Sequence, residues 1–146
     1  MKVNIKKLHP NAIIPKYAKP GDAGMDLYVA DWKFHVDSII GENVGLKVDS
    51  GIAVEIPEGY VGLIFPRSSI KSTGHRLSNA VGVIDSGYRG SIQAYFDITD
   101  NSLVTYGVGD RFAQLIILPY PQIEFNEIDE LSSTDRGEGG FGSTGN

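Results

Sequence analysis

Apolar residues occur in short segments along the chain, and turn residues separate these segments. At 52–56 the sequence Ile-Ala-Val-Glu-Ile places its larger apolar side chains on one face, which is the two-residue period of a half-buried strand. Segments with strand character cover 3–8, 25–30, 44–48, 52–56, 60–65, 81–84, 91–98, 111–118 and 122–125. Gly, Pro and Asp mark turns at 19–22, 57–59 and 107–110. The pattern predicts an all-β domain.

Helical periodicity is weak throughout the chain. No stretch of ten or more residues keeps the 3.6-residue apolar period, and the best helical candidate covers only 68–72, stopped by Gly74. A chain of 146 residues suits one domain with its own core. From about Ser132 the apolar pattern ends. We therefore predict a single β domain over 1–131 and a glycine-rich C-terminal arm over 132–146.

The formal net charge of −5 disfavours a surface for duplex nucleic acid, which needs a basic face. A few focused donors can still hold one small anion on an acidic protein. The absence of cysteine excludes disulfides and thiolate chemistry. No run approaches 18 apolar residues, and the charged N-terminus precedes no apolar segment, so we expect a soluble cytoplasmic protein (of a host cell, if viral) without a membrane partner.

The segment RGEGGFGSTG at 136–145 combines glycines with an arginine, an aromatic ring and two hydroxyls. Consecutive glycine N–H groups can converge on an anion, and Ser143 and Thr144 add hydroxyl donors. Arg136 can supply a forked charged contact to phosphate, and Phe141 can stack on a base. By composition alone, a flexible glycine-rich terminus is the commoner structure.

The segment GVIDSGYRG at 82–90 has the pattern of a tight hairpin turn after an apolar strand. The exposed backbone of such a hairpin can hydrogen-bond a nucleobase. Asp85 can orient and deprotonate a water, and Tyr88 can pack against a sugar. The structural alternative is that Asp85 only closes an Asx turn.

The segment PRSSI at 66–70 follows an apolar strand and opens the helical candidate. Arg67, Ser68 and Ser69 at a helix start can bind phosphate oxygens. The structural alternative is an N-cap serine beside a solvated arginine.

Two polar residues interrupt apolar strands. Gln114 lies within GDRFAQLII, where its amide is either a satisfied core group or a ligand contact. Asp26 lies within AGMDLYVA, where its carboxylate either needs partners or faces solvent by ordinary alternation. Asp110 and Arg111 are interpreted as a structural pair across a turn.

Other sites lack support. His9, His35 and His75 show no zinc-ligand spacing, and no GxSxG motif supports a serine-hydrolase triad. Trp32 is interpreted as a partly packed side chain.

Taken together and in this order, AGMDLY, PRSS, GVIDSGYRG, GDRFAQL and RGEGGFGSTG resemble the five motifs of the homotrimeric deoxyuridine triphosphatase (dUTPase) family. The motifs run from Ala23 to Gly145, so the resemblance covers nearly the whole chain. It implies a jelly-roll β barrel and a trimer with three active sites between subunits. It also implies hydrolysis of dUTP to dUMP and pyrophosphate, which limits uracil in DNA and supplies dUMP for dTMP synthesis.

The resemblance assigns roles to individual residues. Asp85 matches the catalytic aspartate, which activates water for in-line attack on the α-phosphorus, and Tyr88 matches the tyrosine that excludes a 2′-hydroxyl. Asp26 matches the carboxylate that holds Mg²⁺ through water, with the ion bound mainly by the triphosphate. The remaining matches fall into three groups. The hairpin residues that contact uracil are Asn79, Gly82, Val83 and Ile84, and the residues that contact the phosphates are Arg67, Ser68, Ser69 and Gln114. The arm residues, which contact both uracil and phosphate, are Arg136, Phe141, Gly142, Ser143 and Thr144.

Two departures from the family pattern are visible. Ser69 stands where many members have glycine, and it either crowds the phosphate loop or adds a donor. Met25 stands where an aromatic residue is common, which we expect to be neutral because it is a packing position.

Two other functions share parts of this pattern. The related dCTP deaminases carry a glutamate ten positions after the matching aspartate, but here that position is Tyr95, which cannot act as their acid and base. A nucleotide-gated interaction protein, which uses the same pocket to bind a partner, remains as the alternative from another class.

Overall fold

The computed structural model of the chain describes residues 1–36, 43–99 and 106–140. Within these ranges the chain forms ten strands and one short 3₁₀ helix, η1. In chain order they are β1 (Asn4–Lys7), β2 (Met25–Tyr28), β3 (Asp31–Val36), β4 (Asn43–Asp49), β5 (Ile52–Glu55), β6 (Tyr60–Pro66), η1 (Ser68–Ser72), β7 (His75–Leu77), β8 (Gly82–Ile84), β9 (Gln93–Ile98) and β10 (Arg111–Pro119). No helix among these residues is long and apolar enough to cross a membrane.

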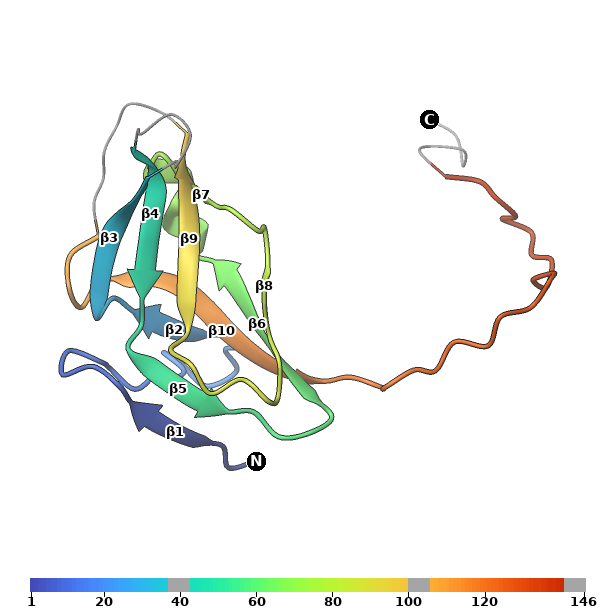
Figure 1. Cartoon of the computed structure of the whole chain (residues 1–146), viewed down its shortest axis with the longest axis horizontal. Coiled ribbons are helices and arrows are strands. Elements are labelled where there is room, and N and C mark those ends of the chain that lie inside the picture. Colours follow the sequence, from blue (N-terminus) through green and yellow to red (C-terminus); the bar gives the residue numbers. More distant parts are fainter. Residues whose placement is uncertain (37–42, 100–105, 141–146) are drawn as a thin grey trace.

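The strands form two four-stranded antiparallel sheets and one two-stranded ribbon (Figure 1). One sheet has the order β2-β10-β6-β8 and the other the order β3-β4-β9-β7, while β1 pairs with β5. Most neighbours in each sheet are distant in sequence, as in a jelly roll. The predicted all-β, jelly-roll fold is therefore confirmed.

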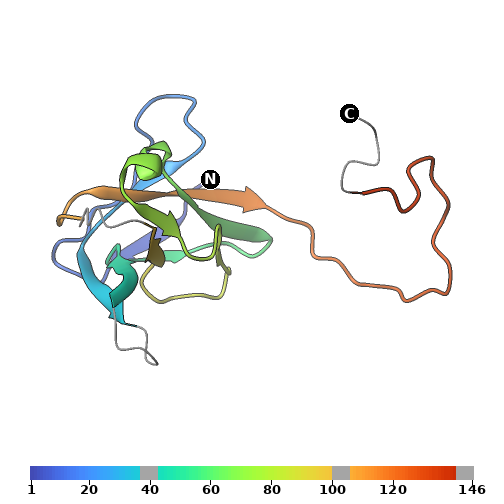
Figure 2. The same ribbon diagram turned by 90° about the horizontal axis from the view of Figure 1, so that it is seen from above.

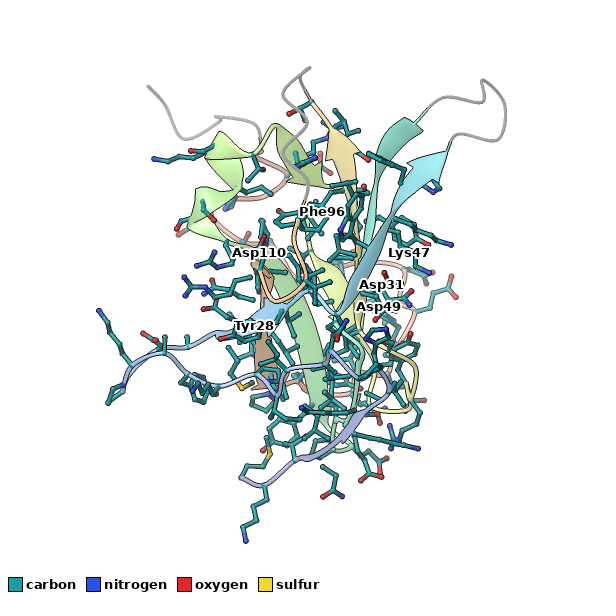
Figure 3. The ribbon with its side chains drawn as sticks, turned by 90° about the vertical axis from the view of Figure 1, so that its left-hand side faces the viewer. Tyr28, Asp31, Lys47, Asp49, Phe96 and Asp110 are labelled. Atoms are coloured by element: carbon teal, nitrogen blue, oxygen red, sulfur yellow. The ribbon has the colours of Figure 1, made fainter. Side chains whose placement is uncertain are left out.

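The core lies between the sheets, where alternating residues of each strand point inward. On β9, Ala94 and Phe96 are buried whereas Tyr95 between them is exposed. Phe96 lies in the interior (Figure 3) and meets Phe112 of β10 edge to face, with ring centroids 6.4 Å apart. This contact joins the two sheets.

Most predicted strands agree with the structure to within one or two residues. Sequence analysis missed β3, although Trp32 and Phe34 alternate with polar residues and their rings pack edge to face at 5.4 Å. It also missed β7, whose three residues are too short to show a period. The strand predicted at 122–125 is wrong: residues 121–140 form no strand and lead away from the domain (Figure 2).

The helical candidate is confirmed, as a 3₁₀ turn rather than an α-helix. Its N-cap is Arg67, which makes no side-chain capping bond, so the predicted N-cap serine is wrong. Gly74 follows the turn with φ +67°, a left-handed conformation that favours glycine. The turn therefore ends where the sequence indicated.

Candidate active site

Asp26 on β2 lies at the centre of a charged cluster. Its residue is only 7% exposed, so the alternative of a solvent-facing Asp26 is wrong. Arg67 Nε donates to Asp26 Oδ1 at 3.0 Å, and Arg111 Nη1 donates to Asp26 Oδ2 at 3.1 Å. We call these three residues the aspartate–arginine cluster. Because two guanidinium groups face one carboxylate, the cluster carries an excess positive charge and suits an anion.

Arg67 enters this cluster from the chain segment just after β6. Its side chain is 23% exposed, so it is not the solvated arginine of the structural alternative. Its Nη1 donates to the Ser69 hydroxyl at 3.3 Å, and both Ser68 and Ser69 are exposed at the start of η1. The structure thus brings Arg67, Ser68 and Ser69 together on one accessible edge.

Sequence analysis missed Arg111 as a member of this cluster. The expected pair between Asp110 and Arg111 does not form, because Asp110 Oδ2 accepts the Gly107 N–H at 2.8 Å while Arg111 turns to Asp26. The available signal was Asp26 itself, since a buried carboxylate requires a cation or several donors. The pairing of β10 with β2 is what places Arg111 beside Asp26.

Gln114 lies next to the cluster on β10. It pairs in register with Asp26 on one side and with Phe65 on the other. A Cβ on Gly24 would lie 3.3 Å from Gln114 Cβ, so this glycine leaves room for the glutamine side chain. Gln114 is half-buried, and its amide makes no hydrogen bond within the described residues. This placement favours a ligand contact over a satisfied core glutamine.

The hairpin predicted around 82–90 is wrong, because β8 pairs with β6 while β7 and β9 belong to the other sheet. The loop between β7 and β8 borders a pocket of about 300 Å³. Asn79 and Gly82 line this pocket together with Ser78, Gln93 and Tyr95. Gly82 is buried against β6, where an added Cβ would lie 3.1 Å from Ile64 Cβ. The pocket therefore presents the backbone of this loop beside polar and apolar side chains, as ligand pockets commonly do.

Asp85 follows β8 and is the first residue of a turn over 85–88. The Tyr88 N–H closes this turn by donating to the Asp85 carbonyl at 3.1 Å. The Asx-turn alternative is wrong, because the Asp85 carboxylate makes no hydrogen bond with any residue the structure describes. Asp85 is exposed and borders a second pocket of about 380 Å³. The other lining residues are Tyr60, Val61, Leu63, Val83 and Tyr120. The carboxylate is accessible to solvent and to a ligand.

Tyr88 is held by the residues that follow it. Its hydroxyl donates to the Ser91 carbonyl at 3.0 Å, and its ring lies over Gly90. A Cβ on Gly90 would lie 2.6 Å from Tyr88 Cζ, so the ring can keep this position only while residue 90 has no side chain.

The cluster and Asp85 lie at opposite ends of β6. Ile84 pairs with Gly62, so Asp85 lies near the start of β6, whereas Arg67 follows its last residue. About six residues of extended strand separate the two levels, which corresponds to roughly 20 Å. One chain alone does not bring these two groups of site residues together.

The segment after β10 extends away from the domain (Figures 1 and 2). Within it, Arg136 Nε donates to the Gly139 carbonyl at 3.0 Å, next to a turn closed by Gly137 and Thr134. The remaining predicted arm contacts, Phe141, Gly142, Ser143 and Thr144, lie outside the described residues. Arg136 is therefore the one predicted arm contact among the described residues, and its printed side-chain contact stays within the arm.

No group of three or more His, Cys, Asp or Glu side chains that could hold a metal ion exists within 1–36, 43–99 and 106–140. Each oxygen of Asp26 already faces an arginine. A carboxylate paired in this way has lone pairs left for a bridging water. The residues present fit a magnesium ion held mainly by a ligand's phosphates, which is a common form of magnesium site.

Comparisons with known proteins agree on one family. The family model for dUTPase matches residues 10–145. The deoxyuridine 5′-triphosphate nucleotidohydrolase of Thermobifida fusca (strain YX) is 42% identical over 99% of this chain and 79% of its own length. That of Escherichia phage T5 is 40% identical over 98% of both chains. The solved structure of the Staphylococcus bacteriophage 80alpha dUTPase with dUPNHPP has a TM-score of 0.80 and 29% identity, and covers 99% of this chain and 98% of that one.

Proposed function

Because the chain belongs to the dUTPase family, we propose that it hydrolyses dUTP to dUMP and pyrophosphate by attack of water on the α-phosphorus. The observation that carries this proposal is the exposed Asp85 carboxylate, which no described residue engages and which borders a pocket. A general base needs this combination of accessibility and an unoccupied acceptor.

In the proposed reaction, the Asp85 carboxylate accepts a proton from a water as the water oxygen bonds to the α-phosphorus. The bond from the α-phosphorus to the bridging oxygen breaks, and pyrophosphate leaves with that oxygen. Such chemistry depends mainly on positioning and on neutralising phosphate charge, because little covalent help is needed. The excess positive charge of the aspartate–arginine cluster serves that purpose.

The phosphates are assigned to Arg67, Ser68, Ser69 and Gln114, and the position of Arg111 beside Asp26 adds a further cation. Magnesium, when bound, neutralises charge on the triphosphate. Asp26 is the residue that would hold the ion, through water, because both carboxylate oxygens already accept from arginines. Asp26 thus also orients the two arginines.

Uracil is assigned to the pocket beside the loop between β7 and β8, which Asn79 and Gly82 line. Val83 and Ile84, which follow Gly82 on β8, are assigned to the edge of the same uracil site. The deoxyribose is assigned to Tyr88, whose ring is fixed by Gly90 and Ser91. A ring held in this position leaves no room for a 2′-hydroxyl. The expected selectivity is therefore for a deoxyribose and for a uracil edge.

We assign the active assembly as a homotrimer with shared sites. The separation of roughly 20 Å between the backbone levels of Asp85 and Arg67 supports this assignment, because it exceeds the length of a triphosphate group. In the trimer, Asp85 of one subunit faces the cluster of another. The arm, which leaves the domain after β10, then brings Arg136, Phe141, Gly142, Ser143 and Thr144 over a neighbouring site.

Pyrophosphate release from dUTP, dTTP, dCTP and UTP, each with Mg²⁺, tests the proposal. We expect rapid release from dUTP and much slower release from the other three. Removing the arm before Arg136 should leave the assembly intact and nearly abolish turnover, because the last strand ends at Pro119. Ammonia release from dCTP, or failure to hydrolyse dUTP, would show the proposed activity to be wrong.

A second candidate is a nucleotide-gated interaction protein that uses the same pocket. It is favoured by the description of the 80alpha phage dUTPases as controlling transfer of virulence genes by a G protein-like mechanism. The Asp85→Asn variant separates the two functions. A nucleotide-gated interaction protein would still bind its partner in a nucleotide-dependent way when it no longer hydrolyses dUTP. Loss of both nucleotide binding and turnover in that variant would count against the second candidate.

A further inference from the structure

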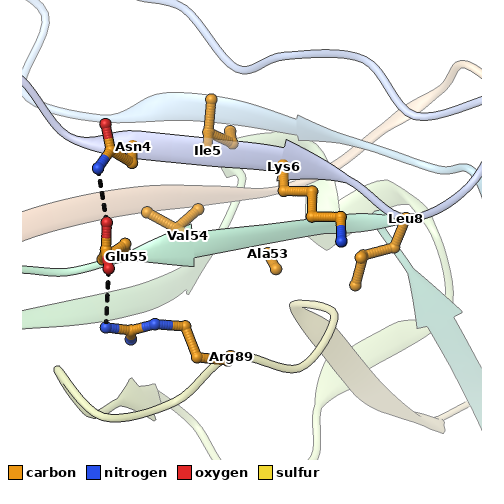
Figure 4. Close-up of a pocket in the computed structure, with 8 residues that line it drawn as sticks. All are labelled: Asn4, Ile5, Lys6, Leu8, Ala53, Val54, Glu55 and Arg89. Atoms are coloured by element: carbon orange, nitrogen blue, oxygen red, sulfur yellow. Dashed lines mark hydrogen bonds and ion pairs between the residues drawn. The ribbon is translucent and has the colours of Figure 1, made fainter.

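Arg89 makes three contacts that tie the 85–88 turn to the rest of the domain. Its Nη1 donates to the Ser86 carbonyl at 2.6 Å and to the Tyr88 carbonyl at 2.9 Å. Its Nη2 lies 3.4 Å from Glu55 Oε1 on β5 (Figure 4). One guanidinium group therefore links two carbonyls of the turn to a neighbouring strand.

Glu55 is itself held from its other side. Asn4 on β1 pairs in register with Glu55, and its Nδ2 donates to Glu55 Oε2 at 2.6 Å (Figure 4). This hydrogen bond from Asn4, followed by the charge of Arg89, lowers the pKa of Glu55. Glu55 thus stays ionised at neutral pH, and it offers Arg89 a charged partner on the β1–β5 ribbon.

The residues that flank the turn are anchored independently. Ile84 before the turn belongs to β8, which pairs with β6. Ser91 after the turn donates to Asp49, which also accepts from Gln93 and from the Gly51 N–H. Asp49, labelled in Figure 3, is the last residue of β4. Between these two anchors, the side chain that donates to the carbonyls of the turn is Arg89.

Asp85 depends on the backbone of this turn for its direction. Its carboxylate makes no hydrogen bond to any described residue, whereas its carbonyl accepts from the Tyr88 N–H. A shift of the turn therefore moves the carboxylate directly, and a misplacement of about 1 Å at a reacting group can lower a rate about 10²-fold.

A simpler explanation treats Arg89 as one half of a surface ion pair. Both side chains are about half exposed, at 52% and 50%, and exposed pairs contribute little to stability. That explanation accounts for the contact with Glu55 but not for the two carbonyl contacts inside the turn. Both carbonyl contacts are shorter than the ion pair.

We propose that Arg89 is a positioning residue that holds the 85–88 turn against β5 and thereby directs the Asp85 carboxylate toward the attacking water. This inference rests on the proposed function, because it requires Asp85 to be the base. Its consequence is a separation of kinetic parameters: the loss of Arg89 lowers kcat and leaves substrate affinity largely unchanged. The uracil pocket at Asn79 and Gly82 and the cluster at Asp26 do not depend on Arg89 for any described contact.

Arg89→Met tests the proposal in the full-length chain, because it removes the donors and keeps much of the side-chain length. We expect kcat for dUTP to fall about tenfold. KM, and the affinity for a non-hydrolysable imido analogue of dUTP, should change by less than about twofold. Lys33→Met is the matched control, because it removes an exposed cation on β3 outside the site.

Two further variants separate the carbonyl contacts from the ion pair. Glu55→Gln keeps the Arg89 donors and should lower kcat only about two- to threefold, whereas Glu58→Gln, on an exposed turn, should have no effect. In Arg89→Ala, millimolar guanidinium chloride should restore part of kcat, whereas sodium chloride at the same ionic strength should not. Rescue by the free cation indicates that the donors themselves position the turn.

The outcomes distinguish this inference from the proposed function. If wild-type protein hydrolyses dUTP and Asp85→Asn does not, but Arg89→Met keeps normal kcat, the positioning role is wrong and the proposed function stands. If Arg89→Met loses kcat and analogue affinity together with a large fall in Tm, Arg89 is structural and the inference is again wrong. If wild-type protein fails to hydrolyse dUTP, both proposals are wrong.

Discussion

The aspartate–arginine cluster and the 85–88 turn place their charges in opposite ways. Asp26 is buried and both of its oxygens accept from arginines, whereas Asp85 is exposed and its carboxylate has no partner among the described residues. The first arrangement fixes a charged surface before a ligand arrives. The second leaves a base available for a proton. The contrast teaches that the fold fixes the group proposed to bind phosphate and only indirectly constrains the group proposed to react.

The largest expected effect comes from Asp85→Asn, which tests the reactive half of the comparison. Losing a general base lowers kcat by about 10²–10⁴-fold. Because Asp85 is exposed and makes no side-chain hydrogen bond in the described chain, Tm should stay unchanged. Pyrophosphate release and thermal unfolding measure the two quantities. Near-normal turnover would remove Asp85 from the role of base.

Asp26→Asn tests the binding half of the comparison. Unlike Asp85→Asn, it should lower stability as well as activity. It leaves Arg67 and Arg111 without their carboxylate in a partly buried setting. We expect the free energy of unfolding to fall by about 2 kcal/mol, because an uncompensated charge remains. Urea unfolding measures this change, with Asp129→Asn on the exposed arm as the control. An unchanged stability would mean that the cluster is not fixed by Asp26.

Gly90→Ala tests how the turn holds Tyr88. The added methyl group would overlap the Tyr88 ring, so the ring must move. We expect the preference for dUTP over UTP, measured as the ratio of kcat/KM values, to fall about tenfold. Gly107→Ala is the control, because its Cβ would meet only the Asp110 carboxylate at 3.3 Å and farther. If selectivity persists, the ring is not what excludes the 2′-hydroxyl.

Ser69→Gly gives the smallest expected effect and refines the description of the cluster. Ser69 accepts from Arg67 over a long 3.3 Å contact, while Arg67 keeps its 3.0 Å bond to Asp26. The phosphate contact assigned to Ser69 can be made by its backbone N–H, which glycine keeps, so we expect KM and kcat to change less than about twofold. A larger fall in activity would show that the Ser69 hydroxyl contacts phosphate directly.

Local patterns in the sequence were sufficient for most of the fold. Alternation identified β5 and β6, and a glycine stop located the end of η1. The segment at 122–125 has the same composition as a strand, but no neighbouring strand pairs with it in the described chain. Strand formation requires a partner as well as a pattern, and the sequence of one segment does not specify the partner.

The sequence named candidate residues for the site but not their arrangement. The motifs identified Asp26, Arg67 and Asp85, yet Arg111 was assigned to its neighbour Asp110. Strand register decides both that contact and the separation of Asp85 from Arg67 along β6. Register depends on pairing between distant segments, so it does not follow from motif spacing alone.

The length of β6 has a consequence for mixtures of defective chains. Asp85 and Arg67 lie at opposite ends of this strand. Every chain of the proposed trimer therefore contributes its Asp85 to one active site and its Arg67 to a different one. A chain with Asp85→Asn and a chain with Arg67→Met are each inactive alone. When they are unfolded and refolded together, some sites receive both intact halves, and activity should return. Complementation of this kind would vanish if one chain carried a whole site.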